Sequence, residues 1–298
     1  MNVSNVIKSR YIRRKFIKKS KVNRSRIGNL ISFILINIFG LFIAMPIVYA
    51  IGNAFKPLDE LWIFPPRLFP NNPTFRNFSD LLNLMQSSWV PISRYLFNTV
   101  FITVVGTVGH ILLASLCAYA LSKHEFYGRK FIFSLIILSL MYNSSVTGTS
   151  NYLIMVGLHW IDTYLSIIIP AFGSSFGLFL MKQFMDQIPD SYIDAARIDG
   201  AKEFKIFWSI VMPSVKPAWL TLIIFSVQGL WNLGSNIYIY KEQLKTFPYA
   251  ISQIVSAGIS RAGIGSAVAV IMMIVPLTIF ILTQSNIIET MTNTGVKE

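Results

Sequence analysis

Six long apolar runs limit what this chain can fold into more than any other feature. They cover residues 27–51, 96–121, 131–153, 163–181, 218–240 and 263–285. Each is about as long as, or longer than, the roughly 20 residues that an α-helix needs to cross the hydrocarbon core of a bilayer. Because lipid offers no hydrogen-bonding partner, backbone groups inside it must be paired within the chain, and helices achieve this. We therefore predict an all-α integral membrane protein with six transmembrane helices within residues 27–285.

The composition and charge agree with this class. Of 298 residues, 53% are hydrophobic and 13% are charged, well below the roughly 25% charged residues of soluble domains. The net charge of +13 would suggest nucleic-acid binding in a soluble domain, but ten of the 26 Lys and Arg residues lie between Lys8 and Arg26. A basic tail beside an apolar run indicates a positive-inside anchor, so no nucleic-acid partner is expected. The single cysteine, Cys117, excludes an internal disulfide.

The distribution of basic residues predicts the orientation of the chain. With residues 1–26 as a cytoplasmic tail, the cytoplasmic segments carry 19 basic residues and the other side carries 7. This places the C-terminal tail, 286–298, in the cytoplasm as well. The extracytoplasmic loops are then 52–94, 143–162 and 241–262, and the prolines of the first predict a folded loop with short helices. The first apolar run is longer than the ~7–15 residues of a signal peptide, so we interpret it as a retained helix.

The cytoplasmic loop 182–217 has the pattern of two short helices. Ser191 and Asp194 have the spacing of a capping box, so the first helix is predicted to begin near Tyr192. Gly200 suits a left-handed turn that ends this helix. A second helix is predicted from about Ala201 to Met212. Its apolar face would hold Phe204, Phe207, Trp208 and Val211.

Two interpretations of this loop remain open from its pattern. The small residues Ala195, Ala196 and Ala201 would let the surface of another protein approach closely, while the aromatic face fastens the loop to the membrane-embedded bundle. Alternatively, the second helix lies on lipid as an interfacial amphipathic helix without a partner. Periodicity alone favours the interpretation without a partner.

The spacing of particular residues carries further information. Asp194-Ala195-Ala196, followed at fixed spacing by Gly200, Ile210 and Met212-Pro213, resembles the EAA signature of permease subunits in ABC importers. The chain departs from it by Asp in place of Glu and Met in place of Leu. Other segments resemble the maltose-type carbohydrate permeases, in particular their polysaccharide-importing branch. These segments are Ala118–Lys123, Phe126–Arg129, Phe179–Phe184, Ile188-Pro189, Trp231-Asn232 and Thr294–Glu298.

This resemblance implies a fold, a function and a set of partners. The fold would be that of a type I ABC importer permease, in a bacterial cell membrane, taking up oligosaccharides or polysaccharide-derived glycans. The partners would be a second homologous permease subunit, two cytoplasmic ATPase subunits and an extracytoplasmic solute-binding lipoprotein. The 182–217 loop would dock as a coupling helix on the ATPase. Asp194 would pair with a basic residue, Ala195 and Ala196 would allow close approach, Gly200 would form the elbow, and Ile210 and Pro213 would anchor the second helix.

Several motifs argue against catalysis on this chain. The sequence contains no Gly-Lys dipeptide and therefore no phosphate-binding P-loop, so ATP and Mg²⁺ are expected on the partner ATPase subunits. Gly173–Gly177 matches the G-x-S-x-G pattern of serine hydrolases, but no histidine lies in the sixth apolar run, where an intramembrane protease of the rhomboid type has its base. The same residues fit the Gly-x-x-x-Gly pattern of close helix packing, which we favour. His124-Glu125 lacks the second histidine of a zinc site, so no metal is expected.

Polar side chains near the ends of two apolar runs are candidates for the substrate pathway. Amide groups and an aromatic face suit sugars, whose hydroxyls need hydrogen bonds and whose C–H faces stack on rings. The alternative is interhelical hydrogen bonding. No Asp, Glu, Lys or Arg lies well inside an apolar run, which weakens the rival hypothesis of a secondary transporter or channel; association with an ATPase would discriminate the two. The candidate residues are Asn143, Ser144, Gln228, Trp231 and Asn232.

Overall fold

The computed structural model describes residues 26–86, 89–142, 144–233, 237–256, 258 and 261–294, and no β-strand occurs among them. The all-α class predicted from the apolar runs is confirmed. In chain order the helices are α2 (Arg26–Ala54), α3 (Leu58–Leu61), α4 (Arg76–Gln86), α5 (Ile92–Lys123), α6 (Arg129–Ser139), α7 (Ser144–Gly157), α8 (Leu165–Phe172), α9 (Ser175–Asp186), α10 (Asp190–Ile198), α11 (Glu203–Ile206), the π-helix η1 (Phe207–Val211), α12 (Met212–Ser214), α13 (Lys216–Trp231), the 3₁₀-helix η2 (Glu242–Leu244), α14 (Phe247–Val255) and α15 (Ala262–Thr294).

Within the described residues, four stretches are long and apolar enough to cross a bilayer. They are α2, α5, the stretch from α8 through α9, and α15. A fifth candidate joins 203–214 to α13 across a bend of 78°. The predicted fifth run also ends earlier than expected, because α13 stops at Trp231.

The predicted third span, 131–153, is not one continuous helix. It consists of α6 and α7, which have 11 and 14 residues, and neither reaches the ~20 residues of a full span. α7 begins at Ser144, the second residue of an Asn-Ser-Ser sequence. Such side chains compete for nearby backbone hydrogen bonds and favour helix ends over helix interiors. The prediction of a single helix here is therefore wrong.

The chain divides into two compact units, one up to Tyr49 and one from Ala50 onward. The first contains most of α2, which spans the first predicted apolar run and includes Pro46. Proline is tolerated in membrane helices, where neighbouring groups can satisfy the freed backbone carbonyl. All further contacts described here lie within the second unit.

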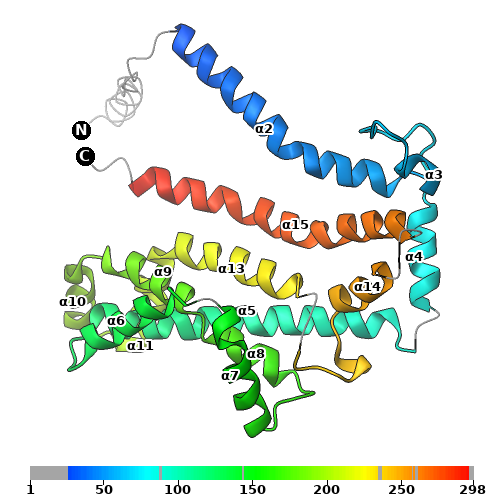
Figure 1. Ribbon diagram of the computed structural model, residues 1–298. Helices are drawn as coiled ribbons and strands as arrows, with labels where there is room; N and C mark the ends of the chain where they lie inside the picture. The colour runs from blue at the N-terminus through cyan, green and yellow to red at the C-terminus, as the bar shows by residue number, and fades with distance from the viewer. Residues whose placement is uncertain are drawn as a thin grey trace, which may run out of the picture. The chain divides into compact units, whose positions relative to one another are not determined.

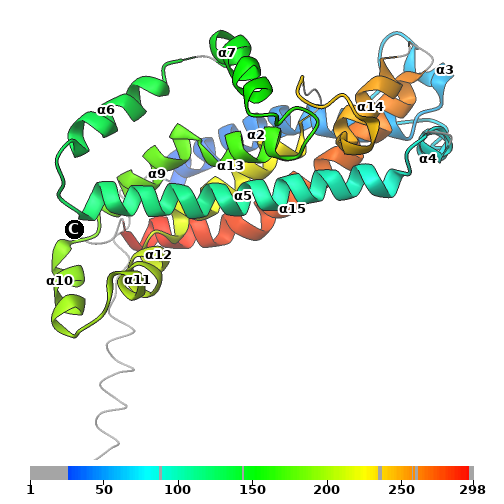
Figure 2. The ribbon, with the colours of Figure 1, turned by 90° about the horizontal axis from the view of Figure 1, so that it is seen from below.

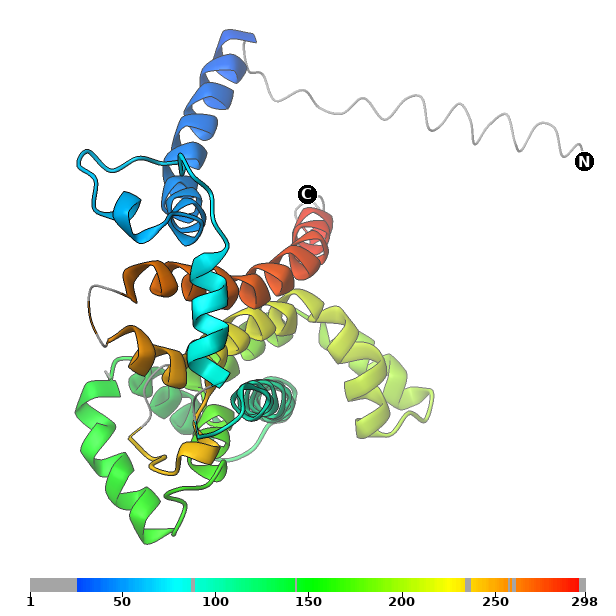
Figure 3. The same cartoon turned by 90° about the vertical axis from the view of Figure 1, so that its right-hand side faces the viewer.

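The 32-residue helix α5 is the central element of the second unit. It packs against α8, α9 and α13, and α13 in turn packs against α15. Figures 1 and 2 show α10, α11 and α12 at the C-terminal end of α5, and α4 and α14 toward its other end. In Figure 3, which looks nearly along α5, green α7 and the yellow-green helices of the 182–217 loop lie on opposite sides of it.

The end of the unit formed by the predicted extracytoplasmic loops has its own apolar core. This core joins α4, α14, α15 and the start of α5, with Leu81, Met85, Phe247 and Ile251 buried among its members. The 52–94 loop contains short helices, as its prolines predicted. Its turns are held by side chains, since the Glu60 carboxylate accepts backbone N–H bonds from residues 71 and 72 at 2.9 and 3.0 Å.

Small residues and one histidine set the spacing of the central helices. The Nδ1 atom of His110 on α5 lies 2.6 Å from the Ser226 hydroxyl on α13, as expected for an interhelical hydrogen-bonding histidine. The imidazole also lies directly against Gly177 on α9, where a Cβ atom would overlap Nε2. Gly109 faces the ring of Phe172 in the same way. The Gly173–Gly177 sequence therefore serves close helix packing, as predicted, at its second glycine.

A methyl group at Gly177 should destabilise this packing. We expect Gly177→Ala to lower the unfolding free energy by about 1–3 kcal/mol, the usual cost of overfilling a packed core. The matched control is Gly229→Ala on α13, because a Cβ there meets no atom within 4 Å. The measurement is the thermal unfolding midpoint of the detergent-purified complex. Equal midpoints for both variants would contradict this packing.

Candidate coupling site

The 182–217 segment begins in the last residues of α9, and the helix that follows, α10, starts earlier than predicted. The helix begins at Asp190 after Pro189, and no side-chain hydrogen bond caps it. The capping box of Ser191 and Asp194 is therefore wrong. Proline fixes the backbone of the entry residue, and a carboxylate in the first turn interacts favourably with the positive end of the helix dipole.

Gly200 forms the elbow that its position predicted. Its φ of +78° lies in the left-handed region, which glycine adopts without the steric cost of a Cβ atom. The N–H of Ala201 donates to the Ala196 carbonyl at 2.9 Å, and the Gly200 N–H donates to the Arg197 carbonyl at 3.0 Å. These bonds satisfy carbonyls left open at the end of α10. The elbow reverses the chain toward α11.

The second helix of the loop is not a regular α-helix, and this changes its buried face. It passes from α11 through the π-helix η1 into α12. A π turn places residues five apart on one side, so Ile206 and Val211 are both buried completely. Phe204 and Trp208 are instead 72% and 41% exposed and stack edge to face on one another. The predicted face is therefore wrong for these two residues.

An apolar core fastens the loop to the bundle. Its buried members come from α5, α9, α10, the second helix of the loop and the start of α13. Ala196, Ala201 and Ile210 pack at its edge, half-buried. The buried members include Tyr119, Met181, Met185, Ile193, Ile206, Phe207, Val211, Met212, Val215 and Leu222.

A polar chain centred on Glu203 connects both halves of the loop to α5. The Tyr119 hydroxyl, near the end of α5, donates to Glu203 at 2.7 Å. The other carboxylate oxygen of Glu203 accepts from the Arg197 guanidinium at 2.9 Å. Arg197 also lies 3.4 Å from the Asp194 carboxylate one turn earlier on α10. Glu203 therefore fixes α10 and α11 relative to one another and to α5.

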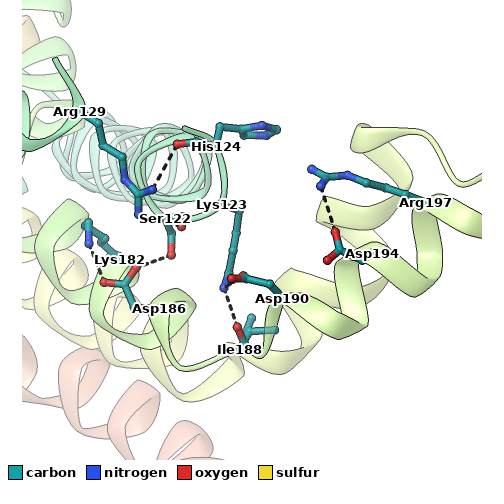
Figure 4. A network of polar contacts seen from close by, with 10 residues as sticks. All are labelled: Ser122, Lys123, His124, Arg129, Lys182, Asp186, Ile188, Asp190, Asp194 and Arg197. Carbon is teal, nitrogen blue, oxygen red and sulfur yellow. Dashed lines mark hydrogen bonds and ion pairs between the residues drawn. The ribbon is translucent and has the colours of Figure 1, made fainter. Parts of the chain in front are cut away.

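A second set of polar contacts fixes the start of α10 (Figure 4). The ammonium of Lys123, the last residue of α5, donates to the Ile188 carbonyl at 2.6 Å and to Asp190 at 2.7 Å. The hydrogen bond from Lys123 lowers the pKa of Asp190 below its ordinary value of 3.8, because it stabilises the charged carboxylate. Asp186, at the end of α9, accepts from Ser122 and Lys182, both at 2.6 Å.

The predicted coupling residues divide into outward and inward groups. Asp194, Ala195, Gly200 and Pro213 are exposed, whereas Ala196 and Ile210 are half-buried against the protein's own core. The structure thus brings the outward group together along α10 and its elbow, and Pro213 lies apart on α12.

The residues that position α10 were missed from the sequence. Tyr119 and Glu203 lie 84 positions apart, and Lys123 and Asp190 lie 67 apart. No local spacing marks such pairs. The sequence signal is that Lys123 closely follows one apolar run and Asp190 lies early in the 182–217 loop, so opposite charges are expected at the same end of the bundle.

The candidate pathway residues are less completely described. Asn143 lies outside the described residues, and the structure places only the backbone of Ser144. Gln228 and Asn232 are exposed near the end of α13, and the Asn232 amide donates to the Gln228 carbonyl at 2.9 Å. The indole of Trp231 is buried and donates to the Met272 carbonyl of α15 at 3.0 Å. A role in substrate passage stays a prediction for all five.

Among the described residues, no group of three or more His, Cys, Asp and Glu side chains is arranged to hold a metal ion. The polar groups of the loop form ion pairs and hydrogen bonds within the chain. Their arrangement is that of a structural joint between helices. The loop is therefore fixed firmly to the helical bundle.

Comparison with known proteins agrees with this class of membrane protein. The family described as "Binding-protein-dependent transport system inner membrane component" matches residues 19–292. The chain is 29% identical to the arabinooligosaccharides transport system permease protein AraQ of Bacillus subtilis, over 91% of this chain and 96% of that protein. It is 26% identical to the polygalacturonan/rhamnogalacturonan transport system permease protein YtcP of the same organism, over 76% and 77%.

The fold is also similar to a solved structure. A chain of a bacterial ABC transporter involved in the import of the acidic polysaccharide alginate superposes with a TM-score of 0.73. The identity is 24%, and the match covers 88% of this chain and 98% of that one. The chain is thus a helical membrane component of the permease type. It belongs to the family of binding-protein-dependent transport system inner membrane components.

Removing the Tyr119 hydroxyl should loosen the loop without disturbing its core. Because Glu203 is about half exposed and keeps Arg197, we expect Tyr119→Phe to cost about 1 kcal/mol locally. Amide hydrogen exchange in residues 190–206 should then be about fivefold faster. Tyr192→Phe on exposed α10 is the matched control. Equal exchange in both variants would show that the hydroxyl does not hold the loop.

Proposed function

We propose that this chain is one permease subunit of an ABC importer that takes up oligosaccharides or polysaccharide-derived glycans. Family membership and the matches to permeases whose names specify arabinooligosaccharide and polygalacturonan transport support this function. The likeness to a chain of an alginate-importing transporter supports the same fold.

The observation that carries this proposal is the construction of the 182–217 loop. Its outward side presents Asp194 and Ala195 before a glycine elbow, and its inward side is buried against α5 and α9. A docking element that transmits force needs both properties, because a partner must reach it and it must not move independently of the bundle. We infer that α10 docks on a cytoplasmic ATPase, with Asp194 facing a basic residue there.

In this mechanism the chain works as part of a larger assembly. The chain has no Gly-Lys dipeptide and therefore no P-loop, so ATP and Mg²⁺ bind two partner ATPase subunits. A second permease subunit completes the pathway, and an extracytoplasmic solute-binding protein delivers the glycan. The basic N-terminal tail supports an orientation with both termini in the cytoplasm. ATP-driven closure of the ATPase pair moves α10, and the bundle changes between inward and outward states.

In this assembly the exposed amides of Gln228 and Asn232 at the end of α13 are proposed to meet the glycan. Asn143, Ser144 and Trp231 complete the proposed pathway set. Amide groups suit neutral hydroxyls, which they can bind as donors and as acceptors.

Charge reversal at Asp194 tests the docking of α10. Its side chain is 63% exposed, and its ion pair within the described part of the chain is the 3.4 Å contact to Arg197, so the subunit should fold without it. We expect Asp194→Lys to reduce glycan uptake and binding-protein-stimulated ATP hydrolysis roughly tenfold, as for a lost interfacial charge pair. Asp199→Lys, which changes an exposed carboxylate that is not one of the matched signature positions, is the control. Normal coupling in an assembled Asp194→Lys complex would reject the assignment.

The elbow can be tested by its backbone conformation. Asparagine tolerates the left-handed region, whereas a β-branched residue does not. We therefore expect Gly200→Asn to retain most of the stimulated ATP hydrolysis and Gly200→Val to lose roughly tenfold. A Cβ at this position meets no atom within 4 Å, so a loss reports on conformation and not on a clash. If both variants couple equally well, the elbow has no part in docking.

A further inference from the structure

A cleft of about 720 Å³ opens where the chain passes from α5 into α6. Its walls come from one short connection, the first turns of α6 and one side chain of α9. The cleft is separate from the outward side of α10 described above. It is lined by Glu125, Phe126, Tyr127, Gly128, Arg129, Lys130, Phe131, Phe133 and Lys182.

The cleft carries more positive than negative charge. Arg129, Lys130 and Lys182 line it, against the single carboxylate of Glu125. The Arg129 guanidinium is held in place because it donates to the Ser122 carbonyl at 3.0 Å and to the His124 carbonyl at 3.5 Å. A guanidinium has five N–H donors, so it keeps donors for a further acceptor. Guanidinium and ammonium groups together are the usual partners of phosphate oxygens.

Lys182 is the buried cation of the cleft. The residue is 8% exposed, and its ammonium bonds Asp186 at 2.6 Å and lies 4.2 Å from the centre of the Phe133 ring. An ammonium held by one carboxylate and one aromatic face keeps a further N–H for another acceptor. The side chain is thus fixed within the wall of the cleft.

An apolar stripe runs along α6 from this cleft. Phe131, Leu135 and Leu138 follow the i, i+4, i+7 spacing of one helix face and are 68%, 49% and 48% exposed. No residue of α6 is buried. The ring of Phe133 stacks on Phe179 of α9, with 6.2 Å between the centres. One side of α6 therefore contacts the bundle, while the stripe beside the basic cleft stays uncovered within the described residues.

We propose that this cleft binds the phosphate headgroup of an anionic phospholipid, with its acyl chains along the stripe of Phe131, Leu135 and Leu138. The proposal rests on the orientation given above, which places the end of α5 at the cytoplasmic leaflet. At the cytoplasmic leaflet, a basic cleft matches the phosphate headgroup of such a lipid, and an apolar helix face beside it matches the acyl chains. The positive charge selects an anionic headgroup over a zwitterionic one. A bound lipid would hold α6, which the bundle contacts on one side.

Lipid retention by the purified complex tests this site. Assembled transporter is depleted of lipid, and binding of phosphatidylglycerol and of phosphatidylcholine is measured by native mass spectrometry. We expect phosphatidylglycerol to be preferred, and Lys130→Gln to weaken its binding about fivefold, the effect of one basic residue near a membrane surface. Lys205→Gln, an exposed lysine outside the cleft that undergoes the same charge change, should bind as the wild type does. Equal loss or equal retention in the two variants would overturn the proposal.

Two further arms identify the occupant. A photoreactive residue at position 131 should crosslink to lipid, and a crosslink to another protein subunit instead would show that the cleft is a protein interface. Glycerol phosphate lacks acyl chains, so at a concentration equal to that of the lipid it should not displace phosphatidylglycerol. Full displacement would overturn the lipid assignment. Because these measurements need neither ATP nor glycan, they are independent of whether the coupling assignment holds.

Discussion

A bilayer offers no hydrogen-bonding partner to the backbone, and the arrangement of this chain depends on that constraint. The apolar runs form helices that pair their own backbone groups. Polar side chains inside the bundle lie where helices meet, as with His110 and Ser226 between α5 and α13, or Trp231 against the Met272 carbonyl. The ion pairs of the described residues lie instead near helix ends and in the short helices that connect the long ones. Groups that can recognise a charged partner are therefore concentrated at the two ends of the bundle.

The 182–217 loop is held mainly by apolar burial and oriented by polar contacts. Ile206, Phe207 and Val211 are at most 2% exposed, and full burial of such side chains contributes ~1.5–3 kcal/mol each. The partly exposed ion pairs around them contribute ~0–1 kcal/mol each. Apolar contacts thus supply most of the stability, while the directional bonds from Tyr119 and Lys123 determine the angle of α10. A loop fixed in both ways moves together with α5.

Features that depend on single residues or local periodicity could be predicted from the sequence, and features that depend on distant contacts could not. The Gly200 elbow needs one residue in one conformation, so its spacing sufficed. The prediction of a single third span failed because apolar composition indicates the length of a run and not whether the helix continues across the Asn-Ser-Ser sequence. The prediction of the aromatic face failed because the π turn changes the helical period and leaves the Trp208 side chain partly exposed. The bond between Tyr119 and Glu203 joins positions too distant for any pattern.

α5 is tied at both ends, and this determines how the two ends of the bundle can communicate. Near its start, the Asn98 amide donates to the carbonyls of Gln243 and Lys245, both at 2.9 Å. At its other end, Tyr119 and Lys123 hold the 182–217 loop. A continuous helix of 32 residues is about 48 Å long at ~1.5 Å per residue. In the proposed mechanism one continuous helix thus joins α10 to the 242–245 turn, so a displacement of α10 would need no relay of side-chain rearrangements to reach that turn.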